Sequence, residues 1–238
     1  MFELRIEGDV ARLRLNRPDV RNAIPLAGWD ELAAKVAKAR TARLIVVAGA
    51  GGAFCAGADL SDFAGMRGDE AAAAAFRGAM RLGLDALELA PMPTIALVEG
   101  PCYGAGVALA MVCDIRLAGP QARFAITPAK MGISYPQEDI HRLVSLVGPG
   151  HAARLLFTGA AIDAVEALRI GLVDGEHGEL AALTSALLAN DSSSLATLKT
   201  GIILAGLGNR SDRDQDEAFD ALLAADAFAA RLEARRRG

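Results

Sequence analysis

Two glycine-rich segments hold the backbone groups of this chain that are best placed to do chemistry. GAGGAFCAGADL, residues 49–60, and GPCYGAGVALA, residues 100–110, each follow a short apolar run. A strand that turns sharply into a helix leaves backbone N–H groups without acceptors, and the helix dipole favours negative charge near them. Donors fixed in advance suit a reaction that places negative charge on a carbonyl oxygen, such as enolate formation from a thioester. A structural interpretation, in which Gly104 and Gly106 only allow close packing, is also open at this point.

Other kinds of site lack their defining residues. The first segment has no lysine followed by serine or threonine, as a phosphate-binding loop requires. Phe54 stands where a dinucleotide fingerprint needs its third glycine, and no serine lies in the pattern of a nucleophile elbow. The three histidines, His141, His151 and His177, each lie alone on expected helices or helix ends, which favours structural roles and predicts no metal site.

The segments around the two loops predict how the loops are positioned. Residues 43–48 and 94–98 are short apolar runs, typical of buried parallel strands, and an alanine-rich helix is expected from about Asp69 to Leu89. The alternation of strands and helices predicts right-handed crossovers and a largely parallel sheet. Ligands bind beyond the carboxyl ends of strands in such sheets, and both loops fall at that end. We therefore expect the two loops to belong to one site.

The rest of the chain predicts a mixed core and an all-helical tail. Residues 2–7 and 10–16 alternate apolar and polar around Gly8-Asp9, as in a β-hairpin. Further helices are expected at about 25–40, 138–147, 150–157, 162–170, 179–189, 194–207 and 212–237, and the second glycine-rich segment is expected to form a tight corner over residues 100–106. Amphipathic helices need a surface to bury. We expect an α/β core of residues 1–190 and a packing or oligomerisation region of residues 191–238.

The composition limits the classes of partner that this protein is expected to bind. A net charge of −4 supplies no basic field for nucleic acid, and every long apolar run is broken by a charge, so neither nucleic acid nor a membrane is an expected partner. The N-terminal residues alternate as a strand does and do not resemble a targeting peptide. The three cysteines have no paired metal spacing and fit reduced thiols in a cytoplasmic protein.

The combined pattern resembles the enoyl-CoA hydratase/isomerase family, also called the crotonase superfamily. LNRPDVRNAI, GAFCAGADL, VEGPCYGAGVALAMVCDIRLA and FAITPAKMGI follow one another in the order and spacing of that family. The resemblance covers nearly the whole chain. It implies an α/β spiral of strand-strand-helix turns with a C-terminal helical trimerisation region, and a homotrimer or a dimer of trimers. It also implies an acyl-CoA substrate, with coenzyme A as part of the substrate and no permanently bound cofactor.

The same resemblance assigns residues to the site. It implies that the thioester carbonyl lies between two backbone N–H groups, which fall on Ala58 and Ala105. The family usually has glycine at the second position, and alanine keeps the donor provided that its φ is negative. The coenzyme A groove is expected to be lined by Arg21, Ala23, Ala56, Ala58, Asp59 and Leu60.

Two departures from the family pattern bear on the reaction. Hydratases of the family use two glutamates as general acid and base, and those positions are Ala108 and Ala129 here. Each lost acid or base costs about 10² to 10⁴ in rate. Standard hydration is therefore not expected.

The loop and helix start MGISYPQEDIHRL offer other candidate groups, namely Tyr135, Glu138 and Asp139. Its Gly-x-x-Tyr pattern with a later histidine is similar to the methylmalonyl-CoA decarboxylase branch. Two reactions are favoured: double-bond isomerisation with Glu138 or Asp139 as the base, or decarboxylation near Tyr135. Both acids also suit a helix first turn, where they complement the dipole. A non-standard hydratase and a non-catalytic acyl-CoA-binding subunit stay open as alternatives.

Overall fold

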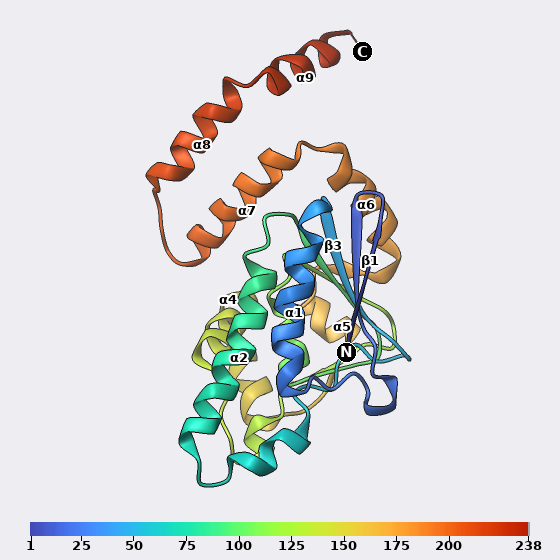
Figure 1. Cartoon of the computed structure of the whole chain (residues 1–238), viewed down its shortest axis with the longest axis vertical. Helices are drawn as coiled ribbons and strands as arrows, with labels where there is room; N and C mark the ends of the chain where they lie inside the picture. The colour runs from blue at the N-terminus through green and yellow to red at the C-terminus, as the bar shows by residue number, and fades with distance from the viewer. Residues whose placement is uncertain (238) are drawn as a thin grey trace.

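The computed structural model describes residues 1–237 and builds the core on a six-stranded sheet (Figure 1). The strands run in the spatial order β1 (Phe2–Glu7), β2 (Val10–Leu15), β3 (Leu44–Gly49), β4 (Thr94–Val98), β6 (Ile115–Ala118) and β9 (Gly175–Glu176). β1 and β2 form an antiparallel hairpin, and the other neighbours pair parallel. The apolar runs of β3 and β4 are buried almost throughout, as strands covered on both faces must be. The predicted hairpin and largely parallel sheet are confirmed.

A second, three-stranded sheet gives the chain its spiral form. It consists of β5 (Pro101–Tyr103), β7 (Arg123–Ala125) and β8 (Ile162–Asp163), with β7 in the middle. The chain passes from β4 to β5 and then into helix α3 (Ala105–Met111), and it repeats this from β6 to β7 and α4 (Gln137–Thr158). Each turn thus contributes one strand to each sheet, followed by a helix, which is the α/β architecture expected.

Strand β5 corrects one prediction, because residues 100–106 do not form a single tight corner. Residues 101–103 pair in parallel with residues 123–125, and α3 already begins at Ala105. A three-residue strand is too short to show alternation, and its pairing partner is distant in the sequence. The hydrophobic pattern of the sequence therefore gave no indication of strand β5.

Helices α1 (Leu26–Lys38) and α2 (Glu70–Glu88) pack against each other beside the sheet (Figure 1). They approach closely at Gly83, where a Cβ atom would lie 2.7 Å from the carbonyl oxygen of Trp29. The predicted break between two helices near residue 148 is confirmed as a kink within α4, since Gly148 has a φ of +75° and Pro149 follows it. The remaining core elements are α5 (Ala164–Arg169) and the 3₁₀ turns η1 (Pro18–Val20), η2 (Ala39–Thr41), η3 (Leu60–Met66), η4 (Pro128–Met131) and η5 (His177–Glu179).

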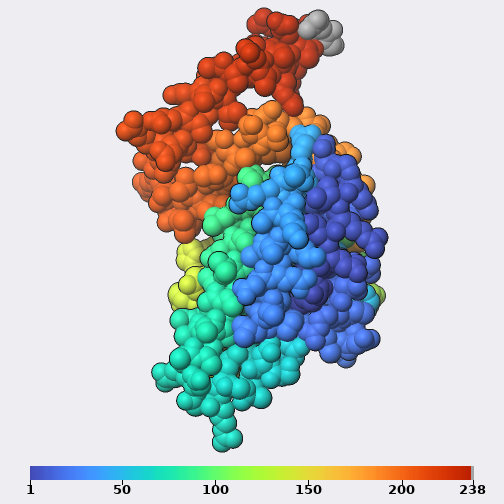
Figure 2. All heavy atoms as spheres, in the orientation of Figure 1, coloured from blue at the N-terminus to red at the C-terminus, as the bar shows by residue number. Residues whose placement is uncertain are grey.

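The chain ends in four helices, α6 (Leu180–Ala189), α7 (Ser192–Gly206), α8 (Arg213–Leu223) and α9 (Asp226–Arg237). The single helix expected over residues 212–237 is wrong, since α8 ends at Leu223 and α9 begins at Asp226. No glycine or proline marks this break, so the sequence pattern could not reveal it. Figure 2 shows α8 and α9, in red, at one end of the molecule, with α7 between them and the core. No helix within residues 1–237 is long and apolar enough to cross a membrane.

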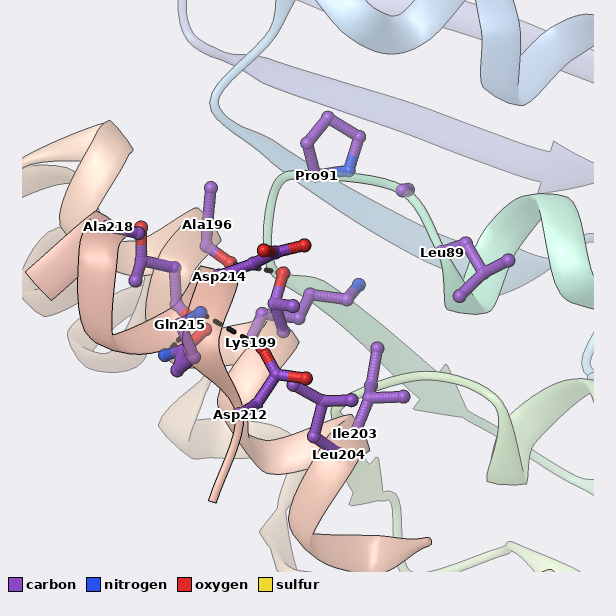
Figure 3. Close-up of a pocket in the computed structure, with 13 residues that line it drawn as sticks. Leu89, Pro91, Ala196, Lys199, Ile203, Leu204, Asp212, Asp214, Gln215 and Ala218 are labelled. Atoms are coloured by element: carbon purple, nitrogen blue, oxygen red, sulfur yellow. Dashed lines mark hydrogen bonds between the residues drawn. The ribbon is translucent and has the colours of Figure 1, made fainter. Parts of the chain in front are cut away.

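A buried lysine ties α7 to the sheet. Lys199 Nζ lies 2.8 Å from Asp114 Oδ2 and donates to the carbonyl oxygen of Met92 at 3.1 Å. The same Asp114 oxygen accepts a hydrogen bond from the N–H of Thr94, at the start of β4. Lys199 lies on the wall of a cavity of about 560 Å³ between the end of α2 and helices α7 and α8 (Figure 3).

We expect Lys199→Met to destabilise the protein by about 1 to 3 kcal/mol, because it removes the buried cation of this ion pair and leaves the carbonyl oxygen of Met92 without its donor. Urea unfolding followed by circular dichroism measures the change. Lys38→Met, at an exposed lysine near the end of α1, is the control and is expected to change the unfolding free energy by no more than about 0.5 kcal/mol. Equal unfolding free energies for the two variants would contradict the assigned role of Lys199.

Candidate active site

The backbone around Ala58 turns one N–H group away from its neighbours in the fold. Ile24 and Ala58 form a parallel β-bridge, in which the N–H of Ile24 donates to Gly57 and the N–H of Asp59 donates to Ile24, both at 2.8 Å. In such a bridge the central residue directs its own N–H and C=O to the opposite side. Ala58 lines a cavity, and its N–H donates to no other described residue.

Ala105 supplies a second free donor by its place in a helix. It is the first residue of α3, and the first N–H groups of a helix have no intrahelical acceptor. The preceding Gly104 has φ +51° and ψ −118°, a conformation that favours glycine, and Gly104 lines the cavity too. Among the described non-glycine residues only Arg21 and Asn22 have positive φ. The condition set for Ala105, a negative φ, is therefore met.

The two loops are joined by backbone hydrogen bonds. Cys55 and Cys102 form a β-bridge, in which the N–H of Cys55 donates to Pro101 at 3.0 Å and the N–H of Tyr103 donates to Cys55 at 2.8 Å. A Cβ atom on Gly57 would lie 2.9 Å from the carbonyl oxygen of Tyr103 and 3.5 Å from the nitrogen of Ala105. The segment that carries the first donor therefore lies directly against the segment that carries the second. The two loops expected to lie at one edge of the sheet are therefore adjacent in the structure.

The cavity beside these donors has a volume of about 770 Å³ and a mostly apolar wall. It is lined by residues 56–58, 60, 63, 66, 67, 73, 76, 77, 80, 104, 105, 127, 128, 131 and 133–137. Phe63 and Phe76 meet edge to face within this wall, with their ring centroids 5.3 Å apart. No aspartate or glutamate lies among these lining residues, whereas two arginines do. The wall thus combines an apolar surface, two backbone donors and positive charge.

Tyr135 occupies the part of the cavity next to α3. It is buried, and its hydroxyl donates to the carbonyl oxygen of Gly104 at 3.0 Å. Burial, reinforced by the negative charge of Asp139, raises the pKa of Tyr135 well above its ordinary value. The tyrosine therefore stays protonated and holds the carbonyl group that precedes the Ala105 donor. Ala108 is fully buried in α3, and Ala129 is exposed in η4 and does not line the cavity.

The two acids of the following helix lie away from the cavity wall. Glu138 is exposed, and Asp139 is fully buried with its Oδ1 3.2 Å from Nη1 of Arg81. Burial raises the pKa of Asp139, and the positive charge of Arg81 offsets this only in part. Its second oxygen, Oδ2, is buried without a hydrogen-bond partner among the described residues. Neither Glu138 nor Asp139 lines the cavity.

The raised pKa of Asp139 predicts a pH-dependent contribution to stability. Because the folded protein favours the neutral carboxyl, this contribution is present below the ordinary aspartate pKa and is lost as pH rises through the folded-state value. We expect the stability of the native protein, relative to Asp139→Asn, to increase as pH falls from about 7 to about 4. Urea unfolding of both proteins across that range measures the difference. A difference that stays constant or decreases as pH falls would contradict the assignment.

The residues expected to line the coenzyme A groove lie on two adjoining strips of backbone. The N–H of Ala56 donates to the carbonyl oxygen of Arg21 at 2.9 Å, which places Arg21, exposed and with φ +50°, beside the first loop. Ala56 and Leu60 line the cavity, while Arg21, Ala23 and Asp59 do not. Asp59 accepts hydrogen bonds from Ser61 and from Arg17, and these bonds lower its pKa.

Two residues that hold this strip in place were not singled out from the sequence. Arg17 Nη1 donates to the carbonyl oxygen of Ala23 at 2.7 Å and to Asp59 at 2.9 Å. Asn22 is fully buried, with φ +60°, and its Nδ2 donates to the carbonyl oxygens of Ala50 and Ala53. Asparagine tolerates this left-handed conformation better than most residues. Both residues lie within LNRPDVRNAI. The feature of the sequence that could have indicated their structural role is the asparagine that follows the exposed loop.

Comparisons with known proteins identify the family of this chain. The model of the enoyl-CoA hydratase/isomerase family matches residues 5–193. The chain belongs to this family. A probable enoyl-CoA hydratase of Mycobacterium bovis is 39% identical over 167 residues, which cover 69% of this chain and 66% of that protein. The mitochondrial Δ3,5-Δ2,4-dienoyl-CoA isomerase of Mus musculus is 33% identical over 226 residues, which cover 89% of this chain and 69% of the isomerase.

A solved structure extends the likeness to the fold of the whole chain. The crystal structure of an enoyl-CoA hydratase/isomerase family protein from Hyphomonas neptunium matches with a TM-score of 0.93 and 34% identity, covering 99% of this chain and 94% of that one. The crotonase-type spiral expected from the sequence is therefore confirmed. Within residues 1–237, no three His, Cys, Asp or Glu side chains gather in a way that could hold a metal ion.

Proposed function

We propose that this member of the family binds an acyl-CoA thioester with the carbonyl oxygen between the N–H groups of Ala58 and Ala105. The observation that carries the proposal is that both unpaired donors lie on the wall of one apolar cavity. As an enolate forms, negative charge grows on the carbonyl oxygen. Donors held in place before the reaction stabilise that charge without having to reorganise.

The favoured reaction is decarboxylation of a β-carboxyacyl-CoA. The bond between the α-carbon and the carboxylate breaks, its electron pair moves into the thioester as an enolate, and carbon dioxide leaves. The α-carbon then takes a proton from water. This sequence needs no carboxylate base, in agreement with a lining that has no aspartate or glutamate and with Ala108 and Ala129 at the hydratase positions. Tyr135 acts here as a positioning residue, because its hydroxyl holds the Gly104 carbonyl next to the Ala105 donor.

Double-bond isomerisation is the second candidate. Asp139 favours it, because this buried carboxyl has a raised pKa and one oxygen without a partner among the described residues, features common in catalytic bases. The side chain of Asp139 would have to reach the cavity, whose wall it does not form in this structure. Glu138 is exposed and would have to move further.

We also propose that residues 191–238 form an oligomerisation region of a homotrimer or a dimer of trimers. Helices α7 to α9 expose several large apolar side chains, which support such a role: Leu198, Ile202, Phe219, Leu223, Phe228 and Leu232. Sedimentation equilibrium of the full chain measures the assembly, and a monomer at micromolar concentration would rule the proposal out.

Two assays of the purified protein test the proposed function. Incubation of β-carboxyacyl-CoA and saturated acyl-CoA thioesters in deuterated water is expected to release carbon dioxide from the first and to exchange the α-protons of the second. Tight binding without release or exchange across the panel would instead identify a non-catalytic acyl-CoA-binding subunit. Rapid hydration of crotonyl-CoA would show that this enzyme is a hydratase in spite of its two alanines.

A further inference from the structure

The charge of the cavity wall differs in sign from that of the chain. The whole chain has a net charge of −4, whereas the charged side chains that line the cavity are Arg67 and Arg77 alone. The positive charge of this wall attracts an anionic group, and no acidic side chain among the lining residues repels it. Fatty acyl groups are neutral, so an apolar wall would be sufficient to bind one.

Neither arginine is used by the fold. Arg67 follows η3 and Arg77 lies on α2, and both side chains are exposed with no ion pair or hydrogen bond to another described residue. Arg81, one turn further along the same helix, is bound instead to Asp85 and Asp139. Guanidinium groups that stabilise this fold are thus paired, while the two that reach the cavity are left available.

The surroundings of the two arginines indicate what they bind. Arg67 and Arg77 line the same cavity as the packed rings of Phe63 and Phe76, so they share its wall with an apolar surface suited to a hydrocarbon chain. The planar guanidinium group forms paired hydrogen bonds with a carboxylate. We propose that the acyl group carries a free carboxylate and that Arg67 and Arg77 bind it, which makes carboxyacyl-CoA thioesters the substrate class of this site. This inference rests on the proposed acyl-CoA function.

Binding of matched ligands separates the two proposals. Isothermal titration of the full chain compares butyryl-CoA with malonyl-, succinyl- and glutaryl-CoA, which share the coenzyme A part and differ in the acyl carboxylate. At least one carboxylated thioester is expected to bind at least about 10-fold more tightly than butyryl-CoA, as a charge-assisted contact predicts. If no thioester binds, the proposed function fails. If butyryl-CoA binds as tightly as every carboxylated ligand, the carboxylate inference fails while acyl-CoA binding at this site stands.

Substitutions assign the preference to the two side chains. At least one of the variants Arg77→Gln and Arg67→Gln is expected to weaken binding of the carboxylated ligand by about 10-fold more than it weakens binding of butyryl-CoA. Arg5→Gln, at an exposed arginine of β1, makes the same change in charge away from the cavity and is expected to alter neither affinity. Equal weakening of neutral and carboxylated ligands would mean that the arginines bind the phosphates of coenzyme A, and it would overturn the inference.

Discussion

Ala105→Pro is expected to lower the rate of the enolate chemistry of this protein by about 10² to 10³ while leaving its fold intact. Proline has no N–H, so the substitution removes one of the two proposed donors to the thioester carbonyl. The site tolerates proline, because Ala105 is the first residue of α3, where no intrahelical hydrogen bond is lost. The preceding Gly104 has no Cβ to clash with the proline ring, and its ψ of −118° lies outside the helical region that proline disfavours.

Loss of one such donor lowers the rate by about 10² to 10³. The measurement is kcat/KM for carbon dioxide release, or α-proton exchange in deuterated water, with circular dichroism to confirm the fold. Ala105→Gly is the matched control, since it keeps the N–H and is expected to stay within a few-fold of the native rate. Activity retained in Ala105→Pro would remove Ala105 from the site.

Gly106→Ala is expected to have the second largest effect, because it forces the two donor loops apart. A Cβ atom on Gly106 would lie 2.4 Å from the carbonyl oxygen of Cys55 and 2.9 Å from the Cys55 Cβ. Both atoms belong to the bridged loop that leads to Ala58, so relief of the clash must move that loop. Overpacking of this kind costs about 1 to 3 kcal/mol. We expect a loss of stability in that range together with at least a 10-fold loss of kcat/KM.

Gly78→Ala provides the matched control for this substitution. Gly78 lies within α2, and a Cβ atom there would meet nothing within 4 Å. Alanine in place of glycine inside a helix stabilises it by about 0.5 to 1 kcal/mol. Chemical unfolding and steady-state kinetics of both variants measure the effects. A Gly106→Ala protein as stable and as active as Gly78→Ala would show that the two loops are not held together at this contact.

Sequence reasoning was most successful where a pattern is long and local. The alternation around Gly8-Asp9, the apolar runs of β3 and β4 and the alanine-rich α2 each predict their element from their own residues. It failed where an element depends on pairing with residues distant in the sequence, and where a helix ends without a glycine or proline. β5 exists because residues 123–125 pair with it, and the break between α8 and α9 falls at Ala224 and Ala225, which are good helix formers.

The site shows the same division. The sequence predicted that the two glycine-rich loops lie together, because both follow parallel strands at the carboxyl edge of the sheet. In the structure they approach closely at Gly57 and Gly106. The sequence did not predict which side chains face the cavity. Asp139 faces Arg81, which is 58 residues away in the sequence, rather than the cavity, and Tyr135 is held by the Gly104 carbonyl. Arg67 and Arg77 line the cavity but belong to no sequence motif, so the sequence did not indicate them as site residues.

A crystal structure of the protein with a bound acyl-CoA tests the central claim most directly. Our account predicts that the thioester carbonyl oxygen lies about 2.7 to 3.2 Å from the backbone nitrogens of both Ala58 and Ala105, with the acyl group inside the cavity lined by Phe63, Phe76 and Tyr135. A thioester bound with its carbonyl oxygen out of reach of either nitrogen would contradict it.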